Sequence, residues 1–349
     1  VQFRVHPNDD SLRVLCYTKN AQYDGHWTEA TKVARGLLVR TQKEDFSDAI
    51  VVERPWRKFF TFSQLSDTEW VLGDEEREGD SVEAELARID FSLPAETTDK
   101  ADGSLGILYR APDGLPSLST KGSFNSDQAN HFTEFMRRDE KMLHEMDSLL
   151  KKSDTTHLFE LVGPEMRIVL PYEKDDVIFL GGVNKRTGGY LSPNGNKNWS
   201  GTVTETMKTK TVAEALSLPD RAGREGVVIR ILSDDPSKQM QLKVKQDEYK
   251  KLHHYIDGAT KTKDVREALQ KSNMTTKDIQ AFGAIGVDAI PELKELFSAT
   301  TIDHPWIEEQ MAAKKERVRK ILEGSIGEIL EAQKMVESLP DSDFGHADA

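Results

Sequence analysis

Several features that are common in proteins are missing from this chain of 349 residues, and each absence excludes something. The single cysteine, Cys16, excludes an intramolecular disulfide and any zinc site built from cysteines. No apolar run approaches the roughly 18 residues that a membrane-spanning helix needs. The glycine-rich loop ending in Gly-Lys-Ser/Thr is also absent, which disfavours a P-loop metabolic ATP enzyme.

Positive charge is scarce as well, because the formal net charge is −13. This argues against a protein that coats nucleic acid by bulk electrostatic attraction. Lysines do gather with His253 and His254 over residues 238–263, where either a local basic groove or a solvated helix face would explain them. The N-terminus lacks the features of a signal peptide. We therefore expect a cytoplasmic protein, encoded by a cell or by a phage.

Hydrophobic periodicity indicates strands, then helix, then strands again. Residues 1–125 have the pattern of short strands joined by polar turns, most clearly at 34–39 and 49–52. A helical period, with apolar residues three and four apart, covers 127–152. The following strands are expected at 157–163, 177–183, 225–232 and 240–245, with a short helix at 212–217.

Two stretches have a different composition. Residues 74–85 are acidic and predict an exposed loop. After Lys245 the strand signals stop, and helices are expected over 246–256, 261–271, 275–283, 287–297 and 304–338. This shift places a domain boundary at about 246–255. We assign residues 1–248 to one domain, which includes an N-terminal strand module, and 249–349 to a helical domain.

A lysine at a turn begins an ordered series of five motifs. Lys100 stands two residues before Asp102-Gly103 and an apolar strand pattern. Gly103 would let a ligand approach the backbone closely. The later motifs are Thr120-Lys121-Gly122-Ser123, Phe159-Glu160-Leu161-Val162-Gly163-Pro164, Arg224-Glu225-Gly226-Val227-Val228 and Leu242-Lys243-Val244-Lys245. Side chains alternate along a strand, so Lys243 and Lys245 share one face.

Each motif alone has an ordinary structural interpretation. Lys121 would be a turn lysine in solvent, and Glu160 would be a barrel-interior or edge-strand residue. Alternating lysines are typical of the exposed face of a half-buried sheet. The functional interpretation therefore depends on all five motifs occurring in this order.

A lysine that takes up a nucleotide covalently would explain the whole series. An amine is nucleophilic only when neutral, so we expect Lys243, Lys245 and partial desolvation to lower the pKa of Lys100. The same two lysines would neutralise phosphate charge during transfer. Glu160 and Glu225 would accept bonds from ribose hydroxyls or hold a hydrated Mg²⁺. The product would be a lysine–nucleotide phosphoramidate, with pyrophosphate released.

The ordered motifs resemble motifs I, Ia, III, IV and V of the covalent nucleotidyltransferase superfamily of ligases and capping enzymes. Residues 179–190 occupy the place of motif IIIa, and the resemblance covers about 30–250. Upstream, residues 34–37 and 54–60 resemble the N-terminal module of the phage T4 RNA ligase 1 family. That resemblance implies that Arg35 and Lys58 grip the β and γ phosphates of ATP. It also fits a helical C-terminus in place of the OB-fold found in DNA ligases and capping enzymes.

The resemblance implies an α+β fold: a mixed, mostly antiparallel nucleotidyltransferase core of the ATP-grasp-like ligase type, followed by an all-helical domain that contacts RNA. It implies an ATP-dependent RNA ligase that joins 5′-phosphate and 3′-hydroxyl ends through lysyl-AMP and an adenylylated RNA end. Lys100, Lys243 and Lys245 would be catalytic. Glu160 and Glu225 would hold Mg²⁺ or Mn²⁺. ATP would be bound by Arg35, Lys58, Lys100, Gly103, Lys121, Glu160, Glu225, Lys243 and Lys245.

The expected partners are ATP and single-stranded RNA ends, with tRNA repair suggested by the resemblance alone, and the expected state is a monomer off the membrane. A DNA ligase or a GTP-using capping enzyme remains an alternative, although the missing OB-fold argues against it. A non-catalytic RNA-binding scaffold is another, although a scaffold has no need of intact lysines and glutamates.

Overall fold

The computed structural model describes residues 1–23, 25, 27–62, 89–152, 154–194, 196–247, 249, 250, 253, 316 and 320. The chain divides into two units, Val1–Tyr249 and Lys250–Ala349, and the fold below belongs to the first. Of the helix predicted over 246–256, Gln246 is not helical, whereas the other described residues, 247, 249, 250 and 253, are. The acidic loop at 74–85 and nearly all of the later helices lie outside the described residues, so the all-helical domain stays a prediction.

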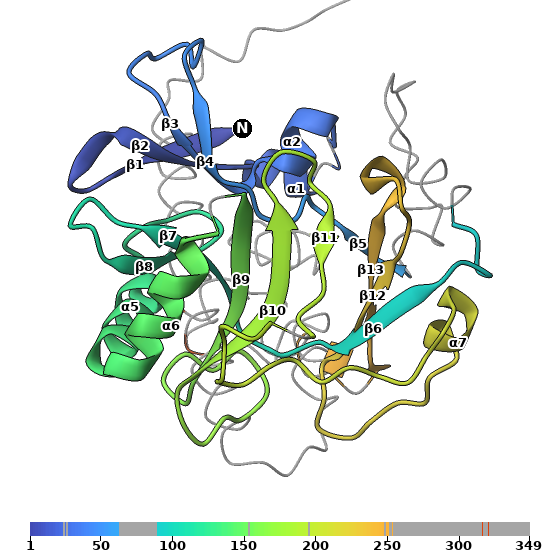
Figure 1. The fold of residues 1–349 in the computed structure, drawn as a ribbon. Helices are drawn as coiled ribbons and strands as arrows, with labels where there is room; N and C mark the ends of the chain where they lie inside the picture. The colour runs from blue at the N-terminus through green and yellow to red at the C-terminus, as the bar shows by residue number, and fades with distance from the viewer. Residues whose placement is uncertain are drawn as a thin grey trace, which may run out of the picture. The chain divides into compact units, whose positions relative to one another are not determined.

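The N-terminal sheet consists of four antiparallel strands in the order β1-β2-β3-β4 (Figure 1). The strands are β1 (Gln2–His6), β2 (Asp9–Cys16), β3 (Arg35–Arg40) and β4 (Ile50–Glu53). This confirms the strands expected at 34–39 and 49–52. Two short helices between β2 and β3 were not predicted, namely α1 (Lys19–Tyr23) and α2 (Glu29–Val33).

The central sheet has the order β11-β10-β9-β7-β8 and is antiparallel throughout. Its strands are β7 (Ser104–Arg110), β8 (Pro116–Ser119), β9 (Thr155–Val162), β10 (Asp176–Asn184) and β11 (Tyr190–Leu191). Helices α5 (Asp127–Arg138) and α6 (Glu140–Leu150) pack against it through a core that includes Phe132, Met146 and Phe159.

The helical stretch predicted over 127–152 is two helices rather than one. Asp139 ends α5 with an extended backbone and begins α6 as its N-cap. Its carboxylate accepts a hydrogen bond from the backbone N–H of Met142 at 3.0 Å. Aspartate is a strong N-cap residue, and this preference overrides the continuous apolar period.

The third sheet has the order β5-β13-β12-β6. Its strands are β5 (Phe60–Thr61), β6 (Ala95–Asp99), β12 (Gly226–Ile231) and β13 (Met240–Lys245), and a 3₁₀ turn, η2 (Pro236–Lys238), precedes the last. Only the β5–β13 pairing is parallel among the described strands. Helix α7 (Val212–Leu216) covers this sheet with Val212 and Ala215. The fold is therefore α+β with mixed, mostly antiparallel sheets, as predicted.

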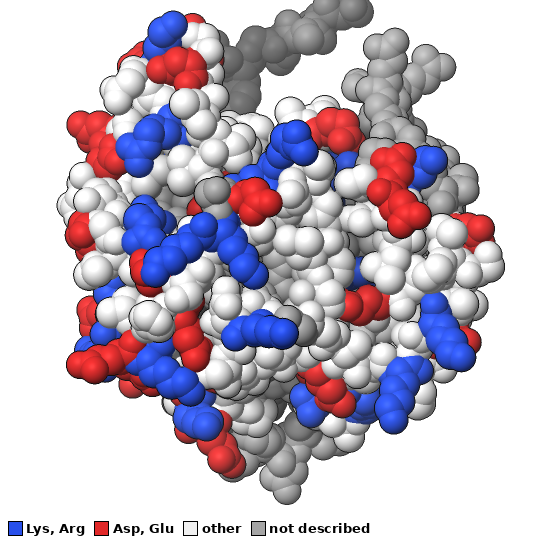
Figure 2. All heavy atoms as spheres, viewed as in Figure 1, with Lys and Arg blue, Asp and Glu red and all other residues white. Residues whose placement is uncertain are grey.

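A shared hydrophobic cluster joins the sheets. Leu38 of the N-terminal sheet, Leu158 of the central sheet and Val228 of the third sheet belong to it. No described helix is long and apolar enough to cross a membrane. The face shown in Figure 2 carries charges of both signs, with Lys and Arg gathered left of centre and uncharged surface beside them.

Candidate active site

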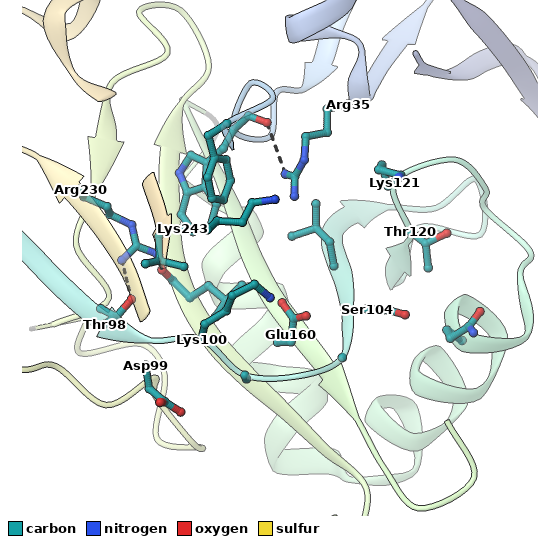
Figure 3. Close-up of a pocket in the computed structure, with 18 of the residues that line it drawn as sticks. Arg35, Thr98, Asp99, Lys100, Ser104, Thr120, Lys121, Glu160, Arg230 and Lys243 are labelled. Atoms are coloured by element: carbon teal, nitrogen blue, oxygen red, sulfur yellow. Dashed lines mark hydrogen bonds between the residues drawn. The ribbon is translucent and has the colours of Figure 1, made fainter. Parts of the chain in front are cut away.

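A cavity of about 400 Å³ is lined by residues of all three sheets (Figure 3). Its volume lies in the usual range of small-molecule sites. Six of the nine predicted site residues line it: Arg35, Lys100, Gly103, Lys121, Glu160 and Lys243. Lys58, Glu225 and Lys245 do not line it, but each interacts with residues that do, as described below.

Lys100 follows β6 directly and is fixed at both ends. Its backbone N–H donates to the carbonyl of Gly226 at 3.0 Å. Its Nζ donates to Oε2 of Glu225 at 2.7 Å, and Lys245 Nζ lies 3.0 Å from the other carboxylate oxygen. The first, fourth and fifth motifs thus meet at one carboxylate, although Lys100 and Glu225 are 125 residues apart in sequence.

The pKa of Lys100 moves in the direction opposite to the one expected. Burial would lower it, but the carboxylates of Glu225, Glu160 and Asp102 together outweigh burial and raise the pKa of the ammonium. The sequence-based prediction of a lowered pKa was therefore wrong for this state. Lys243 and Lys100 do interact, but the carboxylates dominate at Lys100.

Glu160 on β9 points toward Lys100 inside the cavity (Figure 3). Burial raises the pKa of its carboxyl to about 7. The negative charge of Glu225 acts in the same direction, while Lys100 and Arg35 oppose it. Among the described residues Glu160 forms no ion pair, so its oxygens face the cavity.

Cations gather around the rest of the cavity, and Lys243 extends toward Arg35 (Figure 3). The Arg35 guanidinium lies 5.3 Å from the ring centroid of Phe59, and Lys243 Nζ lies 4.9 Å from the same centroid. Burial first, then the charges of Lys58, Lys100, Arg35 and Lys245, hold the pKa of Lys243 well below its ordinary value. Such a group of cations favours a bound polyanion.

Lys58 is held by aromatic rings. Its Nζ lies 5.0 Å from the ring centroid of Trp27, 5.2 Å from that of Phe60 and 5.8 Å from that of Tyr17. Burial and then the neighbouring cations lower its pKa to about 8. Lys121 joins the group, because its Nζ donates to the hydroxyl of Tyr17 at 3.1 Å.

Asp102 fixes the turn that carries Lys100. One carboxylate oxygen accepts from the backbone N–H groups of Val169 and Leu170 at 2.8 and 2.7 Å. The other accepts from the hydroxyl of Tyr249 at 2.6 Å. Asp102 is therefore a positioning residue, and its place in the first motif was a usable signal that sequence reasoning left unassigned.

Gly103 is required for a different reason than the one expected. A Cβ at this position would collide with the backbone carbonyl of Leu161 and with the side chain of Val162. The close approach is thus between the turn and β9. Gly103 nevertheless lines the cavity, so the expected proximity to a ligand is retained.

The carboxylates could support a metal only as part of a partly hydrated site. Within the described ranges, no cluster of three or more His, Cys, Asp or Glu side chains could hold an ion. Mg²⁺ commonly uses one or two carboxylates, waters and substrate phosphates instead. Both Glu225 oxygens are engaged by lysines, which leaves Glu160 as the carboxylate better placed for such an ion.

Sequence reasoning missed residues that the fold brings to the site. Tyr17 holds Lys121 from a segment without any distinctive pattern. Thr98 and Arg230 line the end of the cavity away from Arg35 and Lys121. Trp56 lies between the two ends, because its ring centroid is 4.8 Å from the Arg230 guanidinium and its carbonyl accepts from Arg35 Nη1 at 3.5 Å. A usable signal did exist for Arg230, which interrupts the apolar run of β12.

Comparison with known proteins identifies a family for the chain. The family model described as RNA ligase, of the T4 type 1 group, matches residues 33–250. A Thermovibrio ammonificans protein named as a candidate RNA ligase is 30% identical over 207 residues, which cover 58% of this chain and 50% of that protein. The match thus spans half the length of this relative.

Two solved structures are similar in part. An archaeal ATP-dependent RNA ligase has a TM-score of 0.45 and 12% identity, covering 91% of this chain and 72% of that one. A lysine-to-alanine variant of Naegleria gruberi RNA ligase, with ATP and Mn, has a TM-score of 0.37 and 16% identity. This second match covers 47% of the chain and 53% of the Naegleria protein.

Proposed function

Because the chain belongs to the RNA ligase family, we propose that it is an ATP-dependent RNA ligase in which Lys100 carries AMP covalently. The observation that carries the proposal is the pairing of Lys100 and Lys245 with Glu225 beside a cavity lined by further cations. A buried carboxylate with two lysine partners orients an amine toward a ligand. The surrounding cations favour a ligand that is a polyphosphate.

In the first step the Lys100 amine attacks the α-phosphorus of ATP. A nitrogen–phosphorus bond forms, the bond to the β-phosphate oxygen breaks, and pyrophosphate leaves. Lys100 must lose a proton for this attack, and the Glu225 carboxylate at 2.7 Å is within reach to accept it. Lys243 and Lys245 neutralise charge on the transferred phosphoryl group.

Arg35, Lys58 and Lys121 form the proposed clamp for the β and γ phosphates. Lys58 interacts electrostatically with the other two. Burial disfavours its charged form, and a bound anion would offset that effect. A divalent cation, Mg²⁺ or Mn²⁺, would supply further neutralisation of phosphate charge when bound. Glu160 would hold it, and Glu225 would contribute once its lysine contacts are released.

In the second step AMP passes from Lys100 to an RNA 5′-phosphate. In the third, a 3′-hydroxyl attacks the activated end and AMP departs. Orientation of the two ends supplies much of the rate. We place these steps in residues 1–248 and assign RNA contacts to residues 249–349. The proposed setting is a monomer acting in the cytoplasm on single-stranded ends, including those of tRNA.

The test is adduct formation with α-labelled ATP and a divalent cation, followed by denaturing electrophoresis. We expect label on the wild-type chain and none on Lys100→Ala. Lys151→Ala is the matched control, because this exposed lysine pairs with Asp147 away from the cavity. Label retained on Lys100→Ala would overturn the assignment.

Two further assays distinguish an RNA ligase from a capping enzyme, a DNA ligase and a non-catalytic scaffold. Labelled GTP in place of ATP tests for a capping enzyme, and sealing of single-stranded RNA and DNA separates the two kinds of ligase. RNA binding without any adduct would favour a scaffold. We expect adduct from ATP and sealing of RNA.

A further inference from the structure

One end of the cavity is built differently from the phosphate end. Trp56, Leu180 and Val228 provide apolar surface there, with Thr98 and Arg230 among them. Figure 3 shows Arg230 reaching from β12 toward Thr98 on β6. A cavity end with apolar surface and few polar groups suits a nucleobase rather than a phosphate.

Arg230 is almost completely buried, with 2% of its surface exposed, and it is held from several sides. Its Nη1 donates to the hydroxyl of Thr98 at 2.7 Å. Its guanidinium carbon lies 4.8 Å from the ring centroid of Trp56 and 4.5 Å from that of Tyr190. Glu96 lies 4.0 Å from Nη1 and offsets its charge. The guanidinium therefore has one orientation.

This arrangement leaves hydrogen-bonding capacity unused. Nε of Arg230 and Nε1 of Trp56 are buried without a partner. The remaining bond of Arg230 is a long one, from Nη2 to the carbonyl of Leu180 at 3.5 Å. Leu180 is the extra residue of a β-bulge, where the pairing of β10 with β9 shifts between Phe179 and Gly181.

Unpaired buried donors alone do not indicate a ligand, because Arg13 has two of them away from the cavity. Arg230 differs in that it lines the cavity. An arginine that served only to join Thr98 to the two rings would do so at the cost of unpaired buried donors. Bulges near functional sites often redirect a backbone group, and the Leu180 residue at this bulge lines the cavity. The end of the cavity therefore combines a cationic donor with a backbone acceptor.

We propose that Arg230 determines which nucleobase the cavity accepts, by donating to a ring nitrogen of adenine while the Leu180 carbonyl accepts from its exocyclic amino group. This inference deepens the proposed function and rests on it. Guanine has an oxygen where adenine has that amino group, so the Leu180 carbonyl would face a second acceptor. Unpaired groups in a buried site discriminate strongly between such bases.

The test compares nucleotide analogues in the wild type and in Arg230→Met. Single-turnover adduct rates are measured with ATP, 1-deaza-ATP, 7-deaza-ATP and GTP. We expect the wild type to lose at least about tenfold with one deaza analogue, because a hydrogen bond to the guanidinium is missing. We expect Arg230→Met to be slower with ATP and to use ATP and that analogue equally.

A second buried arginine gives the matched control. Arg13 lies between Phe3 and Phe46, at 5.0 Å from each ring centroid, and does not line the cavity. Arg13→Met should keep the wild-type discrimination among the four nucleotides. If Arg230→Met fails to fold by circular dichroism, Arg230→Leu, which also lacks a donor, takes its place, with the same equality of ATP and analogue expected.

Two results would overturn the inference. One is a wild type that uses both deaza analogues as well as ATP. The other is a folded Arg230 variant that keeps the full discrimination, as a structural residue would. Either result leaves adduct formation from ATP intact, whereas failure of the wild type to form an adduct overturns the proposed function itself.

Discussion

The partly buried lysines around the cavity form two sets that differ in their partners. Lys100 and Lys245 share the carboxylate of Glu225, whereas Lys58 and Lys243 lie against aromatic rings. Burial acts to lower the pKa of Lys100, Lys58 and Lys243 alike, yet the carboxylates reverse the outcome at Lys100 alone. The presence of a carboxylate partner, rather than burial, thus decides whether the pKa of a lysine is raised or lowered.

The difference has a functional meaning under the proposed mechanism. The set paired with Glu225 is held in place before the ligand arrives, which preorganises the nucleophile. The set against the rings has no carboxylate partner among the described residues, so an incoming anion would offset its charge. Ligand binding and chemistry would therefore depend on different sets, and substitutions should separate them.

The largest effect is expected from Glu225→Gln, which removes the partner of the first set. We expect adduct formation to fall by about a hundredfold or more, because the amine loses its orientation and its proton acceptor. Single-turnover labelling measures this. Glu134→Gln, an exposed glutamate that pairs with Arg138 on α5, is the control and should match the wild type. A similar loss in both variants would contradict the account.

Lys243→Met tests the second set and should separate activity from stability. We expect the adduct rate to fall by roughly tenfold to a hundredfold. The unfolding free energy of the ligand-free protein should rise by about 1 kcal/mol, because a buried charge without a carboxylate partner is removed. Urea denaturation measures the change. A clear loss of stability would show that Lys243 is satisfied without a ligand.

The pH dependence of stability isolates Lys58. Its pKa is about 8 in the folded chain, against 10.5 for a solvated lysine, so the unfolded chain holds the extra proton between these values. Its unfavourable contribution is fully present below pH 8 and disappears as pH rises toward 10.5. From pH 8 to 10, wild-type stability should rise relative to Lys58→Met by about 1–2 kcal/mol. If the stabilities of the two proteins change in parallel with pH, the pKa of Lys58 is not lowered.

The smallest effect is expected from Tyr249→Phe, which leaves both sets of lysines intact. It deletes the hydroxyl that donates to Asp102 at 2.6 Å. We expect the unfolding free energy to fall by about 1–2 kcal/mol, with little change in nucleotide binding. Tyr172→Phe, which removes an acceptor for the backbone N–H of Asp102, gives a comparison at the same turn. A large loss of nucleotide affinity would place Tyr249 in the binding site instead.

Local patterns in the sequence were enough to predict much of this fold. Short, largely apolar runs bounded by polar turns predicted β9, β10, β12 and β13, and runs of this kind are typical of buried strands. The motifs also predicted that Lys243 and Lys245 lie near Lys100, but not that Glu225 pairs with Lys100 and Lys245. The break at Asp139 was missed because a capping side chain outweighed the helical period.

The features that could not be predicted depend on distances between side chains rather than on the order of motifs in the sequence. The pKa of Lys100 is raised because carboxylates, one of them 2.7 Å away, outweigh burial. The spacing of residues in the sequence does not show which of these effects is larger. The arrangement around Arg230 joins β6, β12 and β11 with Trp56, and no local period links these segments.

Mass spectrometry of the adenylylated chain tests the central claim most directly. The protein is incubated with ATP and Mg²⁺, digested, and each lysine-containing peptide is searched for the added mass of AMP. The account predicts one modified residue, Lys100, and an unmodified Lys243. AMP on Lys121 or Lys243, or no modified lysine in a folded preparation, would contradict it.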